Sequence, residues 1–376
     1  MQIKKPKYYD ISHLLKDYPQ AHYYMAIGER SNGKTYSAID YAIRQYYKSG
    51  EQFAYIRRFG EDIRPKNLSE LFAGHIQNGR IADLSQGKFS TVNYTSGKFF
   101  AASYNEDTRK LDSDSTPMGF AFDLNSMEHH KSLSYPNVTT IVFDEFLSRQ
   151  GYLVNEFTLF MNTISTIVRD RSNVKIFMIG NTVNKYCPYF KEMGLTHIKD
   201  QKPGSVDVYT YGDTSLSVVV EYCDPMSKRG GKSSDVYFAF DNPQLKMITS
   251  GSWEIAIYPH LNIKYRPMDV QYQFFIIFDQ QVLHCELVYT SEHYFMFIHP
   301  KTTPIKDENS DIVYTDRPDE RWNYRVGFTS NKDRLSTTIC RLLLENRVFY
   351  SDNETGEILR NYILWSKQYN SATGGK

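Results

Sequence analysis

The chain has 376 residues, and its 44 Lys and Arg against 43 Asp and Glu give a formal net charge of +1. This length favours two domains, and the near-neutral charge excludes a protein that holds nucleic acid through a general excess of positive charge. The four cysteines include no Cys-x-x-Cys pair, which argues against a zinc ribbon or a disulfide framework, and no apolar run has the length of a membrane span. We therefore expect a soluble, intracellular protein with no membrane partner.

A glycine-rich segment follows the first apolar run of the chain. Residues 22–27 predict a buried strand and 36–48 a helix, and between them Gly-Glu-Arg-Ser-Asn-Gly-Lys-Thr matches the phosphate-binding P-loop. In that loop, backbone N–H groups surround phosphate oxygens at the start of a helix. The predicted nucleotide-binding residues are Gly28, Arg30, Ser31, Asn32, Gly33, Lys34 and Thr35. Lys34 is expected to contact the β- and γ-phosphates of ATP, and Thr35 to bind Mg²⁺.

The next elements extend the fold into a sheet. Residues 53–56 predict a buried strand that ends at Arg57 and Arg58. Alternation of strand, helix and strand predicts a parallel α/β sheet, whose strands bind ligands at their carboxyl ends. Arg57 and Arg58 therefore lie either near the nucleotide or at a subunit edge, or they are solvated cations that close the strand. Further along, 89–104 predict a β-hairpin at an edge of the sheet, 105–115 a solvated polar loop, and 118–124 another strand.

A β-branched and aromatic run over 138–143 ends in Asp144 and Glu145, which is the Walker B pattern. Asp144, at the carboxyl end of the predicted strand, is expected to hold the Mg²⁺ shell together with Thr35. Glu145 is expected to act as the catalytic base that polarises the attacking water. Many strands end in acidic residues, so the assignment depends on the P-loop upstream.

A helix and a further strand follow the Walker B segment. Apolar spacing predicts an amphipathic helix over 155–168 with Asn155 as N-cap, then a strand over 174–179 that leads to Asn181. Asn181 is expected to sense the γ-phosphate during catalysis. Arg169 and Arg171, at the end of the helix, each fit either an arginine finger that reaches a neighbouring subunit's nucleotide or a cation that meets the helix dipole.

Taken together, residues 28–35, 50–58, 135–146 and 169–190 resemble the DNA-packaging ATPases (encapsidation proteins) of small short-tailed phages, compact relatives of terminase large subunits. The resemblance covers the first half of the chain and becomes diffuse after it. It implies that Arg169 is the trans-acting finger and that Lys131 acts across the subunit interface. Larger terminases carry an arginine at the position of Arg30 that has been assigned as a finger in cis, so the choice among Arg169, Arg171 and Arg30 stays open.

The resemblance also implies a function and partners. The chain would be a motor subunit that uses ATP and Mg²⁺ to translocate double-stranded viral DNA into a preformed procapsid. It would form a homo-oligomeric ring, expected to be a pentamer, docked transiently at the portal protein in the host cytoplasm, and the need for a packaging RNA stays open. Two alternatives also stay open: a terminase large subunit with an active nuclease, and an NTP-binding scaffold that does not hydrolyse.

The second half of the chain has less distinct patterns. We expect a P-loop (ASCE-type) ATPase domain over 1–195, a linker region over 196–245 with a strand pattern near 207–222, and a C-terminal domain over 246–376. In the C-terminal domain, strands are predicted over 253–258, 272–278, 282–289, 294–299 and 348–350, and helices over 332–346 and 357–365. The resemblance implies a smaller α+β RNase-H-like domain, a degenerate nuclease used for docking.

Candidate metal ligands in this half are sparse. Asp279 lies at the end of a predicted strand, but a two-metal nuclease needs several convergent carboxylates. The other acids considered, Glu286, Glu292 and Asp333, are scattered along the sequence. His284, His293 and His299 lack the i,i+4 spacing of helical metal ligands, so we interpret them as structural.

Overall fold

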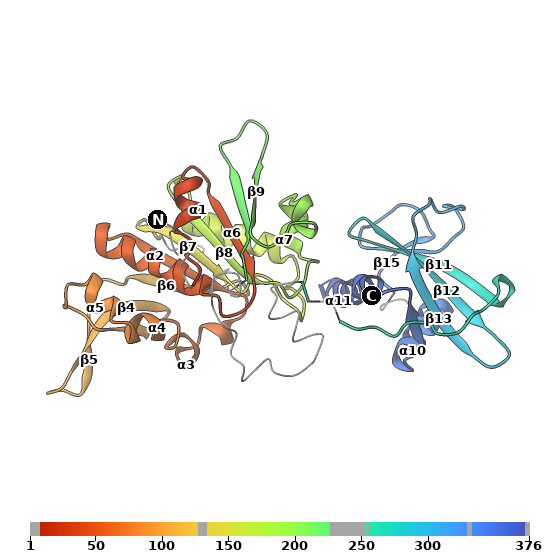
Figure 1. Cartoon of the computed structure of the whole chain (residues 1–376), viewed down its shortest axis with the longest axis horizontal. Helices are drawn as coiled ribbons and strands as arrows, with labels where there is room; N and C mark the ends of the chain where they lie inside the picture. Colours follow the sequence, from red (N-terminus) through yellow and green to blue (C-terminus); the bar gives the residue numbers. More distant parts are fainter. Residues whose placement is uncertain (1–7, 127–133, 226–252, 255, 329–332, 373–376) are drawn as a thin grey trace, which may run out of the picture. The chain divides into compact units, whose positions relative to one another are not determined.

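The computed structural model describes residues 8–126, 134–225, 253–254, 256–328 and 333–372 (Figure 1). The chain divides into two compact units, one of Met1–Ser148 with Asn155–Glu254 and one of Arg149–Val154 with Ile255–Lys376. Each unit is built on its own β-sheet. Among the described helices, none combines the length and the apolar character that crossing a membrane would require.

A large, mostly parallel sheet forms the first unit. Its strands, in order across the sheet, are β3 (Thr91–Thr95), β4 (Lys98–Asn105), β6 (Gly119–Asp123), β2 (Gln52–Arg57), β7 (Val138–Asp144), β8 (Lys175–Asn181), β1 (Tyr23–Gly28), β10 (Ser217–Tyr222) and β9 (Ser205–Thr210), with β5 (Lys110–Ser113) paired to β4. The six strands from β6 to β10 run parallel, and the edges are antiparallel. The predicted parallel α/β fold is confirmed, and β8 lies between β1 and β7, as in ASCE-type P-loop NTPases.

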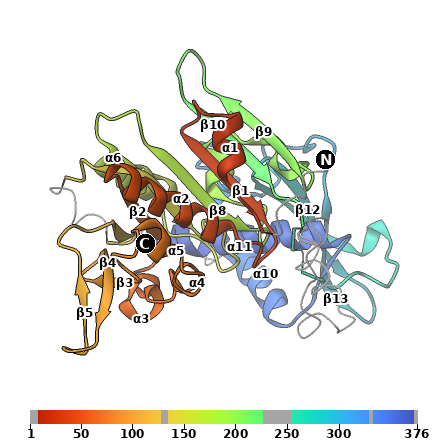
Figure 2. The same cartoon turned by 60° about the vertical axis from the view of Figure 1, so that its left-hand side comes forward.

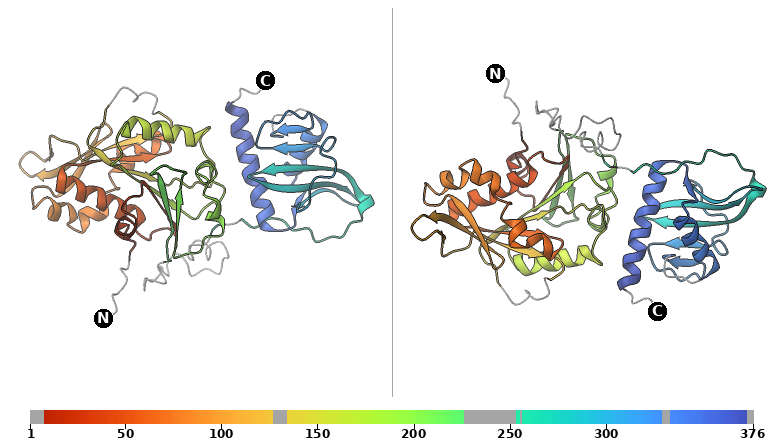
Figure 3. Two further views of the ribbon diagram at one scale, coloured as in Figure 1. Left: turned by 90° about the horizontal axis from the view of Figure 1, so that it is seen from above. Right: turned by 90° about the horizontal axis from the view of Figure 1, so that it is seen from below.

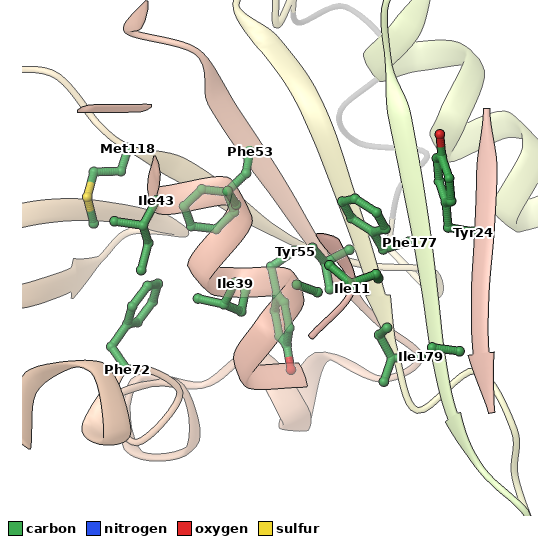
Figure 4. Packing of buried hydrophobic residues seen from close by; sticks show 14 of the residues in the cluster. Ile11, Tyr24, Ile39, Ile43, Phe53, Tyr55, Phe72, Met118, Phe177 and Ile179 are labelled. Carbon is green, nitrogen blue, oxygen red and sulfur yellow. The ribbon is translucent and has the colours of Figure 1, made fainter. Parts of the chain in front are cut away.

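Helices cover this sheet because its central strands are apolar on both faces. Every residue of β1 and β7 is buried, as parallel sheets require. The described helices of the unit are α1 (Ser12–Asp17), α2 (Lys34–Ser49), α3 (Pro65–Leu68), α4 (Ala73–Gln77), α5 (Arg80–Leu84), α6 (Glu156–Val168) and α7 (Pro188–Glu192), with 3₁₀ turns η1 (Gly60–Ile63) and η3 (Thr196–Lys199). Figure 4 shows Ile39 and Ile43 of α2 packed among Phe53, Tyr55 and Phe72 of the core. This packing holds α2 against the sheet.

The predicted hairpin forms one end of the sheet (Figure 2). Ser96 and Gly97 take left-handed φ values of 50° and 75° in the turn between β3 and β4. The polar stretch 105–115 was expected to be a loop, and this is wrong for 110–113, which form β5. All four residues of β5 are exposed, Leu111 among them, so the strand is held by its backbone pairing with β4 rather than by burial of side chains.

Strands β9 and β10 extend the first sheet beyond the expected ATPase range. They lie within 196–245, which the sequence analysis treats as a linker, yet β10 pairs in parallel with β1 and β9 pairs with β10. Val218, Val219 and Val220 of β10 are fully buried. An internal strand beside β1 therefore explains this valine run better than a linker does.

The second unit contains a six-stranded sheet. Its strands, in order, are β15 (Tyr324–Val326), β14 (Val313–Thr315), β11 (Val270–Phe278), β12 (Gln281–Tyr289), β13 (Tyr294–Pro300) and β16 (Val348–Tyr350), and its helices are η5 (Pro267–Asp269), α10 (Arg334–Leu344) and α11 (Asn353–Ala372). β11, β12 and β13 form an antiparallel meander, and β14 and β15 add in parallel beside β11. This strand order confirms the expected α+β, RNase-H-like fold. Asp279 and Gln280 form the predicted turn, with φ of 48° and 65°.

Alternation along the strands gives the second sheet two different faces. Phe278 of β11 contacts Tyr362 of α11, so one face packs against this helix (Figure 3). Leu283 and Cys285 of β12 lie on the same face as Phe278 and are also buried. The opposite face is mixed and carries His284 next to the buried Phe275.

Several predictions for this unit differ from the structure. No strand is present over 253–258 among the residues described there, and α11 is longer than the predicted 357–365. β14 and β15, of three residues each, were not predicted. Asp333, considered as a scattered acid, is the N-cap of α10, where its carboxylate accepts a hydrogen bond of 3.0 Å from the Ser336 N–H.

A buried ion pair joins β2 to α6 in the first unit. Arg58 donates to both carboxylate oxygens of Glu156, at 2.7 and 2.9 Å, and to the backbone oxygen of Phe146 at 2.7 Å. The Tyr189 hydroxyl donates to Glu156 Oε1 at 2.9 Å. The side chains of Arg58 and Glu156 are only 7% and 0% exposed. Removal of one partner would therefore leave the other charge buried without a counter-charge.

We expect Glu156→Ala to lower the free energy of unfolding by roughly 3–5 kcal/mol, because Arg58 then remains buried without its counter-charge. Urea unfolding of the full chain measures this change. Glu61→Ala is the matched control, since its pair with Arg64 is 68–69% exposed and should contribute no more than about 1 kcal/mol. Equal small losses in both variants would contradict a structural role for the buried pair.

Candidate active site

Four neighbouring strands end at one edge of the first sheet. Since β2, β7, β8 and β1 are parallel neighbours in this order, their carboxyl ends bring together Arg57, Asp144, Asn181 and Gly28. Gly28 and Asn181 are directly paired in the register of β1 and β8. Ligands of open α/β sheets bind at this edge. The chain topology thus gathers predicted site residues that are far apart in the sequence.

A cleft of about 990 Å³ opens at this edge. Its lining includes the predicted residues Ser31, Asn32, Gly33, Lys34, Thr35, Asp144, Glu145 and Asn181. Residues that the sequence analysis did not single out complete the wall, among them Tyr8, Tyr36, Asp40, Arg44 and Arg80. The volume lies at the upper end of the range typical of small-molecule sites, which is roughly 300–1,000 Å³.

The loop between β1 and α2 has the backbone of a phosphate-binding turn. Ser31 and Gly33 take positive φ values of 61° and 95°, and Gly33 is the N-cap of α2. A Cβ atom at Gly33 would lie 3.2 Å from the Cβ of Tyr8, in a conformation that other residues rarely adopt. The loop therefore presents the N-terminus of a 16-residue helix to the cleft, where backbone N–H groups favour anions.

Lys34 is buried at the base of this loop, with 4% exposure. Its ammonium donates to the backbone oxygen of Glu29 at 2.6 Å and to the side-chain oxygens of Asn32 and Asn181, each at 3.3 Å. Asn181, the expected phosphate sensor, therefore lies beside the P-loop lysine. The ammonium therefore lies where carbonyl and amide oxygens of the P-loop and of β8 meet.

Thr35 and Asp144 lie within hydrogen-bond distance. The Thr35 hydroxyl donates to Asp144 Oδ1 at 3.0 Å, and the Tyr55 hydroxyl donates to Oδ2 at 3.0 Å. Burial raises the pKa of the Asp144 carboxyl, and the nearby Arg57 and the Tyr55 hydrogen bond oppose this by favouring the ionised form. A hydroxyl and a carboxylate that converge next to a phosphate-binding loop are the hard oxygen ligands that Mg²⁺ prefers, so these residues fit that ion.

Glu145 projects from the end of β7 with a left-handed φ of 56° and a side chain that is 58% exposed. Arg57 Nη2 lies 2.7 Å from Glu145 Oε2, and Arg57 Nη1 lies 4.0 Å from Asp144 Oδ2. Arg57 therefore belongs to the site, whereas Arg58 belongs to the core. From the sequence both arginines stay open, because strand alternation sends adjacent side chains to opposite faces without saying which face meets the site.

The candidate finger residues have different surroundings. Arg171 donates hydrogen bonds to the backbone oxygens of Tyr135, Pro136, Val138, Ile167 and Val168. Arg169 is exposed at the C-terminus of α6, with φ 52° and ψ −125°. It precedes β8, which begins at the edge of the sheet opposite the cleft, so Arg169 lies far from the nucleotide site of its own chain. Arg30 is exposed and does not line the cleft. Lys131 lies outside the described residues.

The second unit brings two acids together. Asp279 and Asp316 follow the parallel neighbours β11 and β14, and the Asp279 N–H donates to Asp316 Oδ2 at 3.3 Å. Asp316 was missed because the short strand before it was not predicted. Within the described ranges, no third His, Cys, Asp or Glu side chain joins them closely enough to hold a metal ion.

The sheet order, the P-loop and the cleft define the first unit as an ASCE-type P-loop NTPase fold. A family model of the podovirus DNA encapsidation protein (Gp16) matches residues 3–204, and the chain belongs to this family.

Two curated relatives cover part of the chain. The DNA packaging protein of Bacillus phage B103 is 31% identical over 172 residues, which are 45% of this chain and 47% of that protein. The DNA packaging protein of Bacillus phage phi29 is 30% identical over 174 residues, 44% of each chain. The chain thus spans about half the length of the curated relatives it matches.

Two solved structures share the fold over almost the whole chain. The bacteriophage Phi-29 viral genome packaging motor assembly has a TM-score of 0.52 and 20% identity, and covers 99% of this chain and 100% of its own. The Phi-28 gp11 DNA packaging motor has a TM-score of 0.50 and 18% identity, and covers 96% and 98%. At these identities the likeness supports the fold.

Proposed function

We propose that the chain is an ATP-hydrolysing motor subunit that translocates double-stranded viral DNA into a preformed procapsid. The observation that carries this proposal is the convergence of Lys34, Thr35, Asp144 and Glu145 on one cleft in a member of the DNA encapsidation family. Each has the chemical group that phosphoryl transfer to water requires. The names of the curated relatives, which are DNA packaging proteins, support DNA as the cargo.

Each residue of the cleft has a different role in the proposed hydrolysis of ATP. Lys34 and the N–H groups of the P-loop bind the β- and γ-phosphates, and Asn181 beside Lys34 contacts the γ-phosphate. Thr35 and Asp144 hold Mg²⁺, which supplies charge neutralisation on the phosphates when bound. Glu145 accepts a proton from the water that attacks the γ-phosphorus, while the bond from phosphorus to the bridging oxygen breaks and ADP leaves. Arg57 positions Glu145.

The proposal includes an assembly. Arg169 lies at the edge opposite its own cleft, which supports a role at the site of a neighbouring subunit and hence a homo-oligomeric ring, expected to be a pentamer. Lys131 is proposed to act across the same interface. The ring docks at the portal in the host cytoplasm, and whether it needs a packaging RNA is an open question. The second unit is proposed to serve as the docking domain, with its nuclease activity lost.

Phosphate release by the full chain tests this function. We expect ATP hydrolysis that rises when double-stranded DNA and portal are added, and Lys34→Ala should abolish it because the phosphates lose their principal cation. Lys48→Ala is the matched control, since Lys48 is an exposed lysine in the last turn of the same helix.

Other outcomes would favour the alternatives. ATP binding without phosphate release in the presence of DNA and portal would support an NTP-binding scaffold that does not hydrolyse. With Mn²⁺, the chain should leave plasmid DNA intact, because Asp279 and Asp316 have no third carboxylate among the described residues. Nicking that disappears in Asp279→Ala would support a terminase with an active nuclease.

A further inference from the structure

A cluster of imidazole and carboxylate groups lies on the face of the second sheet opposite Phe278. His284 of β12 and His299 of β13 are a directly opposed cross-strand pair, and Glu286 lies two residues along β12 on the same face. One ligand atom from each of the three side chains lies within 4.8 Å of the others. All three residues are half-buried, so the cluster is reachable from solvent.

We propose that His284, His299 and Glu286 form a binding site for a divalent transition-metal ion, with Zn²⁺ as the best fit. Two imidazole nitrogens and one carboxylate oxygen are the protein ligands of open zinc sites, in which water takes the fourth position. Bonds of roughly 2.0–2.2 Å to a tetrahedral ion need ligand atoms about 3.3 Å apart, which small side-chain rotations can achieve from the present spacing. Mixed nitrogen and oxygen ligands also disfavour Mg²⁺.

Each of the three side chains has a hydrogen-bond partner that orients it. Gln273 Oε1 lies 3.2 Å from His284 Nε2, and the backbone oxygen of Pro300 lies 3.1 Å from His299 Nδ1. Because both partners are acceptors, these two nitrogens carry the proton, and the other nitrogen of each ring presents its lone pair. The Tyr265 hydroxyl donates to Glu286 Oε2. Metal-binding histidines and carboxylates characteristically have such outer partners.

Ring packing holds the imidazoles in place. The His284 ring stacks on Phe275 with centroids 4.9 Å apart, and the His299 ring meets His284 edge to face at 4.8 Å. Burial lowers the pKa of His284. The charged groups that also face His284 are Glu286, Lys301 and Asp311. The site shares no residue with the ATPase cleft, so its test is independent of the proposed function.

Titration of Zn²⁺ into the chelator-treated full chain tests the site by calorimetry. We expect one equivalent to bind, and binding at this site to be lost in His284→Ala and in His299→Ala. His293→Ala is the matched control because His293 is an exposed histidine in the turn that joins the same two strands. Co²⁺ in place of Zn²⁺ should give visible absorption bands in the wild type and in His293→Ala.

Two conservative variants separate metal binding from folding. Glu286→Gln keeps the shape of the side chain but removes its charge, and it should abolish binding while thermal unfolding in chelator stays near that of the wild type. Tyr265→Phe removes the hydroxyl that orients Glu286 and should weaken binding by ~10–100-fold. Absence of Zn²⁺ binding by the wild type, or unchanged binding in both histidine variants, would overturn the proposal.

Discussion

Replacing Glu145 with glutamine should lower DNA-stimulated ATP turnover by ~10²–10⁴-fold while ATP binding is retained. Glutamine keeps the size of the side chain and can still orient a water molecule, but it cannot accept the proton. The residues proposed to bind the phosphates and Mg²⁺ are separate from Glu145, so affinity should change little. Phosphate release measures the turnover, and displacement of a fluorescent ATP analogue measures the binding.

Glu192→Gln is the control for this variant. Glu192 is an exposed glutamate of α7, outside the lining of the cleft, so its replacement should leave both measurements unchanged. If Glu145→Gln turned over ATP at the wild-type rate, another group would have to be the base, and the assignment would fail. A loss of ATP binding equal to the loss of turnover would also contradict it.

The position of Arg57 fits the different roles proposed for the two adjacent carboxylates. Its guanidinium lies 2.7 Å from Glu145 and 4.0 Å from Asp144, so one cation offsets the repulsion between the two acids. Asp144 is also held by Thr35 and Tyr55, whereas Glu145 is more than half exposed at the mouth of the cleft. In the proposed mechanism, Glu145 is therefore the carboxylate that exchanges Arg57 for a water molecule.

The sequence was most informative where the chemistry depends on contiguous residues. The P-loop and the Walker B segment can each be recognised from a few consecutive residues. In the structure, the Thr35 hydroxyl lies 3.0 Å from Asp144 Oδ1. Arg57 and Arg58 could not be distinguished in this way, since adjacent residues at a strand end differ only in the face they point to. One contacts the candidate base, and the other forms the buried pair with Glu156.

Non-local pairing was the part that the sequence could not supply. The alignment of β10 with β1 joins residues near 220 to residues near 25, and nothing within either segment specifies the other. The same limit applies to side-chain clusters. His284 and His299 are directly opposed only because β12 and β13 pair in one register, and Asp316 lies beside Asp279 only because β14 adds to β11. Helix-type spacing rules do not detect side-chain clusters that form across strands.

Arg169 combines an exposed side chain with an unfavourable backbone. Its φ of 52° and ψ of −125° lie outside the regions that a residue with a Cβ atom normally adopts, at a cost of order 1–3 kcal/mol. Glycine is the usual residue at the end of a helix where φ is positive. An arginine in this position therefore suggests that its side chain has a function that outweighs the strain.

We expect Arg169→Gly to lower ATP turnover by ~10³–10⁵-fold, as for loss of an arginine finger. The same change should leave the free energy of unfolding unchanged or raise it by about 1 kcal/mol, because glycine relieves the strain at this position. Arg171→Ala should have the opposite pattern, with a larger effect on stability than on the chemistry of hydrolysis. Its guanidinium donates to five backbone oxygens, so its loss should lower the free energy of unfolding by at least ~1–3 kcal/mol. Phosphate release and urea unfolding of both variants measure the two effects.

Mixing of inactive subunits tests whether Arg169 acts in trans. A subunit with Glu145→Ala keeps Arg169 and can complete the site of an Arg169→Ala neighbour, which keeps its own Glu145. Mixed rings should therefore recover part of the hydrolysis that neither variant shows alone, with a maximum at intermediate ratios. Mixing either variant with Lys34→Ala, which lacks nucleotide binding but has both other residues, should rescue only Arg169→Ala. If no ratio restores hydrolysis, Arg169 does not act on a neighbouring site.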